Sequence, residues 1–164
     1  MALTGDQMVE TSTDTQPSVS LVIPCRAQYV SLCRLVAGAL GMREALDEET
    51  IADIKVVVTE AFNCFLGPEE EHVAEASDEP AEGQVSSLRL EFTVGAEEWT
   101  IVMSNPDHGR RITPSSVCDP MSEGGLALTI IEALVDSMER TDSDIDGSVF
   151  RLVKKVGLPA ADPE

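Results

Sequence analysis

The hydrophobic pattern of this 164-residue chain switches between strand and helix periodicity in an order that restricts its possible folds. From Ser18 to Cys25, apolar residues occupy alternate positions, which predicts a half-buried strand. From Ala27 to Leu40 they recur at helical spacing, and Gly41 supplies a stop signal. The chain is therefore predicted to begin its folded part with a strand followed directly by a helix.

A second, longer helix is predicted from Asp47 to about Leu66. Asp47 is a favourable N-cap, and Glu48 and Glu49 place negative charge at the positive end of the helix dipole. One apolar stripe runs along the segment and comprises Ile51, Ile54, Val58, Ala61, Phe62 and Phe65. The glycine and proline that follow Leu66 end the pattern.

The rest of the chain adds strands and one more helix. Ser87–Val94 and Glu98–Ser104 predict an antiparallel hairpin that turns at Gly95. A third helix is expected to start at the Gly-Gly pair of residues 124 and 125. Its inward residues are predicted to be Ala127, Ile130, Ile131, Leu134 and Met138. A short strand near Arg140 and a strand from Val149 to Val156 complete the pattern.

This order of elements predicts an α/β (α+β) two-layer sandwich, in which helices cover one face of a mixed, mainly antiparallel sheet. The folded domain should span residues 18–156, between a disordered leader (1–17) and a tail (157–164). Residues 69–83 predict an acidic surface loop. Residues 105–123 lack periodicity over a length that suggests a functional lid.

The charge balance limits the partners of this chain. It carries 11 basic and 30 acidic residues, a net charge of −19, and few aromatic residues that could stack on bases. Direct binding to nucleic acid is therefore not expected, whereas a basic protein partner is favoured. Solubility alone is the alternative reason for such acidity.

The sequence also bears on compartment and metal binding. It has no signal peptide and no stretch that could span a membrane, so we expect a cytoplasmic protein that does not bind membranes. The four cysteines lack CxxC spacing, and His72 and His108 do not complete a zinc site. The cysteines are predicted to be reduced and mostly buried.

Three short motifs carry the candidate chemistry. Glu60 lies on the second helix with its i+4 neighbour Cys64 on the same side. Asp107 and Gly109 follow a predicted strand, where a carboxylate on a tight turn can accept a hydrogen bond from a base. Glycines at the start of the third helix can expose N–H groups to phosphate.

Together, the stretches DIKVVVTEAFN, SEGGLALTIIEALVD and GSVFRLVKK resemble the GHKL (Bergerat) nucleotide-binding domain of the RsbW/SpoIIAB anti-sigma-factor family. The resemblance covers residues 18–156. It implies that ATP or ADP binds with Mg²⁺, that Glu60 is the general base and that Asp107 contacts the adenine amine. It further implies nucleotide contacts at Asn63, Gly109, Gly124, Gly125 and Ala127. For Glu60, the alternative is a surface carboxylate that pairs with Lys55 or solvent.

The chain departs from the family pattern at three site positions. Cys64 stands where the family has its magnesium-binding Asn, and Asn63 is displaced by about 100° around the helix. Either Asn63 reaches the metal through a local distortion, or the metal is held weakly. Arg111 and Ala127 replace family glycines on the phosphate side. We therefore expect weakened ATP binding.

The resemblance implies an anti-sigma regulatory factor that sequesters a sigma factor and is controlled by a STAS-type anti-anti-sigma protein. Arg34 on the first helix matches an arginine with which family members hold their partners, and a homodimer is also implied. The alternative for Arg34 is an ordinary surface arginine. Two functional alternatives stay open: an active ATP-dependent serine kinase acting on the anti-anti-sigma protein, and an acidic regulatory module without nucleotide.

Overall fold

The computed structural model describes residues 16–66, 86–105, 123–143 and 147–157. The order of elements along these residues is the predicted one. They are β1 (Ser18–Pro24), a 3₁₀ turn η1 (Ala27–Tyr29), α1 (Val30–Arg43), α2 (Glu48–Phe65), β2 (Ser87–Val94), β3 (Glu98–Ser104), α4 (Glu123–Leu134), β4 (Ser137–Ser143) and β5 (Gly147–Lys155).

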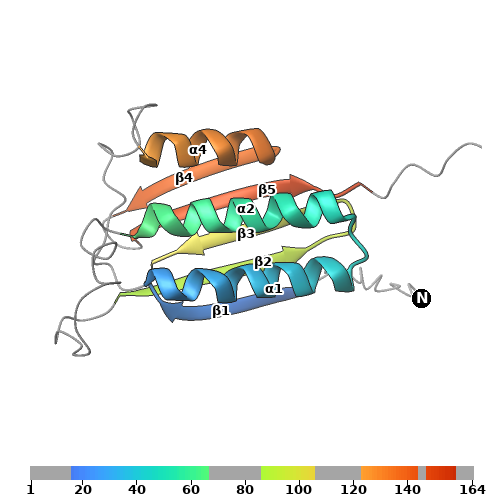
Figure 1. The fold of residues 1–164 in the computed structure, drawn as a ribbon, viewed down its shortest axis with the longest axis horizontal. Helices are drawn as coiled ribbons and strands as arrows, with labels where there is room; N and C mark the ends of the chain where they lie inside the picture. The colour runs from blue at the N-terminus through green and yellow to red at the C-terminus, as the bar shows by residue number, and fades with distance from the viewer. Residues whose placement is uncertain (1–15, 67–85, 106–122, 144–146, 158–164) are drawn as a thin grey trace, which may run out of the picture.

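The strands form one sheet in the order β1-β2-β3-β5-β4, and all four pairings are antiparallel. In Figure 1, α1, α2 and α4 lie side by side over one face of this sheet, with α2 in the middle. This arrangement confirms the predicted two-layer α+β sandwich.

The core lies between the two layers. Strand alternation sends Leu90 of β2, Met103 of β3 and Phe150 of β5 to the same face, where they stand opposite one another in register. All three are fully buried. Burying a side chain of this size stabilises the fold by roughly 1.5–3 kcal/mol.

The two long helices begin and pack largely as predicted. Asp47 caps α2, because its Oδ1 accepts a hydrogen bond from the Thr50 amide at 2.8 Å. Hydrogen bonds from the Thr50 hydroxyl and amide lower the pKa of Asp47. The predicted stripe of α2 is buried at Ile54, Val58 and the positions after it, while the first helix starts with the 3₁₀ turn before α1.

The third helix ends earlier than predicted. α4 stops at Leu134, so Met138 lies in β4, opposite Leu152 of β5. The Lys154 ammonium donates to the Leu134 carbonyl oxygen at 2.7 Å and to Asp53 of α2 at 2.9 Å, which places positive charge at the end of α4. Met138 still contacts the core, but from the sheet.

The cysteines of the described residues are reduced, as predicted: Cys25 and Cys33 are buried and Cys64 is partly buried. Burial raises the pKa of the Cys33 thiol to about 11. Cys118, His72 and His108 lie outside the described residues. The predicted leader, acidic loop, lid-like segment and tail also lie wholly or largely outside them, so these assignments stay predictions.

Candidate functional site

One end of the molecule gathers the elements that carry the predicted nucleotide site. The C-terminal turn of α2, the end of β3, the start of α4 and the β4–β5 end meet at the left of Figure 1. Glu60 and Asn63 reach this end on α2, and Gly124, Gly125 and Ala127 reach it on α4. Asp107, Gly109 and Arg111 follow β3 but lie outside the described residues.

Glu60 and Cys64 lie one turn apart near the C-terminus of α2, and both are partly buried. Burial, and then the nearby Glu60 carboxylate, raise the pKa of the Cys64 thiol to about 11, while Arg140 acts in the opposite direction. The thiol is therefore protonated at neutral pH. A neutral thiol is a poor ligand for Mg²⁺, which prefers charged or carbonyl oxygens.

Asn63 is exposed, and α2 continues as a regular helix through it to Phe65. No local distortion turns its amide toward the side occupied by Cys64. Within the described residues, no group of three His, Cys, Asp or Glu side chains could hold a metal ion. The Cys64 sulfur at the family's metal position therefore fits Mg²⁺ poorly, and a metal-binding role for Asn63 stays a prediction.

Helix α4 brings its glycine pair to the same end. Gly124 and Gly125 lie in the first turn, where helix N–H groups can bind an anion. The hydroxyl of Thr129 donates to the Gly125 carbonyl oxygen at 3.0 Å. Ala127 is buried against the core, so its methyl group packs inward in this structure.

Sequence reasoning missed a polar network at the β4–β5 end. Arg140 Nη2 lies 2.6 Å from Asp142 Oδ2, and the Ser148 hydroxyl donates to Asp142 Oδ1 at 2.7 Å. Ser148 and Asn105 are both buried. The main-chain N–H of Asn105 donates to the main-chain carbonyl oxygen of Ser148 at 3.3 Å. The sequence offered one signal: Arg140 comes two residues after Met138. In a strand, this spacing puts both side chains on the same face of the sheet.

Gly147 fixes the start of β5 beside this network. Its φ of +72° favours glycine, and an added Cβ would lie 2.9 Å from the Asn105 carbonyl oxygen. We expect Gly147→Ala to lower the free energy of unfolding by about 1–2 kcal/mol, because alanine resists the left-handed region. Urea unfolding would measure the loss. Gly157→Ala, which adds a methyl group in open space, should change stability little; equal effects would contradict this reading.

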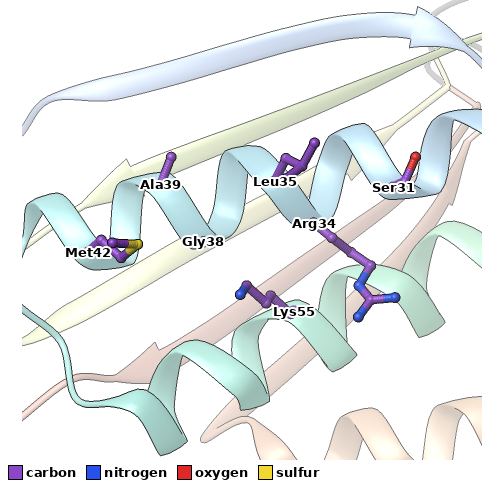
Figure 2. A pocket seen from close by; sticks show the side chains of 7 residues that line it. All are labelled: Ser31, Arg34, Leu35, Gly38, Ala39, Met42 and Lys55. Carbon is purple, nitrogen blue, oxygen red and sulfur yellow. The ribbon is translucent and has the colours of Figure 1, made fainter.

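A second candidate site is a groove on the outer side of α1 and α2, with a volume of about 500 Å³. Figure 2 shows its lining, in which α1 supplies every residue except Lys55 of α2. The lining residues are Ser31, Arg34, Leu35, Gly38, Ala39, Met42 and Lys55. Arg34, the predicted partner-binding residue, therefore lies in a groove and not on a flat surface.

The groove is apolar with a basic wall. Leu35 is 69% exposed and Met42 is 75% exposed, although both are large apolar residues. The stem of Lys55 runs across Gly38, because a Cβ at that glycine would lie 2.6 Å from the Lys55 Cε. Among the described residues that line the groove, the charged ones are Arg34 and Lys55, and both are basic on a chain of net charge −19.

The fold agrees with the class of protein that the sequence comparison identifies. Residues 23–154 match the model of the histidine kinase-like ATPase domain. Because this match spans most of the chain, the protein belongs to the family of histidine kinase-like ATPase domains. The family match implies a nucleotide-binding fold for these residues.

Within that family, the chain is similar to proteins named serine-protein kinase RsbW. It is 30% identical over 128 residues to the RsbW of Bacillus subtilis (strain 168), which covers 73% of this chain and 75% of that protein. It is 26% identical over 152 residues to the RsbW of Staphylococcus epidermidis, with 86% and 90% covered. These relatives support the sequence resemblance to RsbW-type proteins.

Among the described residues, no helix is both long enough and apolar enough to cross a bilayer.

Proposed function

We propose that this protein is an anti-sigma regulatory factor that binds and sequesters a sigma factor under the control of a STAS-type anti-anti-sigma protein. The observation that carries the proposal is the apolar, basic-walled groove on α1 and α2. Its residue Arg34 stands where the RsbW/SpoIIAB family holds its protein partners. The similarity to RsbW proteins supports the same assignment.

The groove has the composition of a protein-binding surface. Leu35 and Met42 expose large apolar side chains, and clustered exposure of this kind marks interaction sites. Arginine and methionine are enriched in protein interfaces, and arginine is frequent among the residues that dominate binding energy. Arg34 and Lys55 would pair with carboxylates of the partner at the groove wall.

The charge of the whole chain suits the same partner. Sigma factors carry basic regions that bind nucleic acid, and a chain of net charge −19 attracts such regions over long range. The acidic surface would accelerate the association of this chain with the sigma factor, while the groove would fix the orientation of the two proteins in the complex. The homodimer implied by the family would present two such grooves.

Affinity purification tests this function directly. The tagged protein should retain one sigma factor from the sigma factors of its source cell, and an added anti-anti-sigma protein should release it. If no sigma factor is retained at low salt, the proposal fails and the acidic regulatory module becomes the better description. Low salt matters because screening weakens charge attraction between exposed groups.

For the nucleotide site, we propose ATP or ADP binding that is weaker than in family members with complete motifs. Departures from the family pattern support this: Cys64 stands at the metal position and Arg111 in the second motif, while Ala127 in the third, whose methyl group packs inward, contributes least. Glu60 on α2 supports the second candidate function, an active serine kinase. Transfer of labelled phosphate from ATP to the anti-anti-sigma protein, and its loss in Glu60→Gln, would establish that function.

Asp107→Asn is expected to weaken ADP binding by about 1–3 kcal/mol, because an amide does not reproduce the carboxylate that accepts from the adenine amine. Calorimetric titration would measure the change. Glu97→Gln is a suitable control, since it also removes a carboxylate charge but is exposed at the β2–β3 turn, away from the site. Unchanged affinity in Asp107→Asn would show that Asp107 is only a turn residue.

A further inference from the structure

Arg140 occupies an unusual place in the sheet. It pairs in register with Phe150 of β5, and Met138, two residues earlier, pairs with Leu152. Phe150 and Leu152 are fully buried beneath the helices, so Arg140 shares the strand face that points toward the helix layer. Its side chain is only 18% exposed. A charged group at such a position requires charged or polar surroundings.

The surroundings of Arg140 belong to the nucleotide end of the molecule. Its guanidinium lies 2.6 Å from Asp142, which also accepts from Ser148. Its register partner on β5 is Phe150. Phe65, beside Cys64, stacks edge-to-face on Phe150 with ring centroids 5.6 Å apart. Arg140 therefore lies under the C-terminal turn of α2, close to the position where the family carries its metal ligand.

The Arg140 guanidinium determines which ions can bind near the position of the family's metal ligand. A divalent cation near Arg140 would be repelled, and the half-buried setting strengthens that repulsion relative to water. The side chain at the family's metal position is the sulfur of Cys64, and it offers no compensating hard oxygen ligand. An anion, in contrast, gains from the same guanidinium, which carries five N–H donors in a planar fork that can bridge a carboxylate and a phosphate.

We propose that Arg140 takes the place of the divalent metal in this site, so that its guanidinium holds the diphosphate of an adenine nucleotide without Mg²⁺. This inference rests on the nucleotide-binding part of the proposed function and is independent of the sigma factor. The N–H groups in the first turn of α4, which lies at the same end of the molecule, would contribute to holding the phosphates.

A purely structural arginine would tie the β4–β5 end together through Asp142 and nothing more. Removing it would change stability but not the response of ADP binding to Mg²⁺. The metal dependence of affinity therefore separates the two roles. Arg140→Lys keeps the positive charge but loses the planar set of N–H donors of the guanidinium. Arg140→Met removes the charge while retaining most of the aliphatic part of the side chain.

The test is calorimetric titration of ADP into the full chain, once with EDTA and once with Mg²⁺. For the wild type, the two affinities should agree within about threefold, since no metal takes part in binding. Arg140→Met should bind ADP at least about tenfold more weakly in EDTA, as expected for the loss of a charged hydrogen bond. Arg140→Lys should recover part of the affinity.

Three controls make the result specific. Arg151→Met carries the same substitution at an exposed arginine on the opposite face of the sheet, across from Glu139, and should bind ADP like the wild type. Adenosine should bind Arg140→Met and the wild type equally, because it lacks phosphate. Inorganic phosphate should bind far more weakly than ADP; equal binding would indicate a free-anion site and overturn the assignment to a nucleotide.

The proposal is overturned if ADP binds the wild type only with Mg²⁺, if Arg140→Met binds ADP like the wild type in EDTA, or if ADP does not bind under either condition. A negative sigma-factor purification would leave these outcomes unaffected. Failure of the partner assignment and failure of the Arg140 assignment can thus be told apart.

Discussion

Phe62→Ala is expected to lower the free energy of unfolding by about 3–5 kcal/mol, the typical cost of removing a buried phenylalanine side chain. Phe62 is fully buried on α2, the helix that packs against both α1 and α4 (Figure 1). Its removal therefore leaves a cavity where the helix layer and the sheet meet. Urea unfolding followed by circular dichroism would measure the loss.

The size of this effect is a large part of total stability, since domains are stable by only about 5–15 kcal/mol. Val56→Ala, on the same helix at a side chain that is 40% exposed, should cost less than about 1 kcal/mol. A loss below 1 kcal/mol for Phe62→Ala, or equal losses for both variants, would contradict the packing described for α2.

Arg34→Glu is expected to weaken the complex with the sigma factor by about 100-fold or more, because a partner carboxylate would then face a like charge. Arg34→Ala should cost less, since it removes the attraction without adding repulsion. Arg34 is exposed in the groove, so neither substitution should affect folding. Titration of both variants against the purified sigma factor gives the two affinities.

Arg43→Glu is the matched control, because Arg43 is an exposed arginine on the same helix that pairs with Glu44 at 2.7 Å and does not line the groove. It should bind the sigma factor within about threefold of the wild type. If Arg34→Glu binds as well as Arg43→Glu, the groove is not the interface, even if the sigma factor is the partner.

Most of the fold could be predicted because its signals are local. The alternation along residues 87–94 and 98–104 and the helical stripe of α2 each report burial on one face of one element. The error at Met138 has a physical origin: an apolar residue four positions after Leu134 fits a helix stripe and a strand equally well. The pairing of β4 with β5 decides between them, and it is a non-local interaction.

The candidate sites likewise have a part that could be predicted from local motifs and a part that depends on contacts between distant segments. The order of the motifs was sufficient to predict that Glu60 and Gly125 lie at one end of the molecule, which the structure confirms, whereas their roles toward a nucleotide stay predictions. Arg140 was not assigned to that end, since its contact with Asp142 and its place opposite Phe150, which stacks on Phe65 of α2, depend on strand register. The sequence placed Arg34 on a helix but did not predict the groove around it. The groove depends on the packing of α1 against α2, which brings Lys55 to Gly38.

The most direct test of the anti-sigma function is transcription in vitro by RNA polymerase carrying the retained sigma factor. Increasing amounts of the wild-type protein should reduce the transcript in proportion to the sigma factor bound, Arg43→Glu should act equally, and Arg34→Glu should have little effect. Addition of the anti-anti-sigma protein should restore transcription. If transcript levels stay unchanged with an excess of the wild-type protein over the sigma factor, this chain is not an anti-sigma factor.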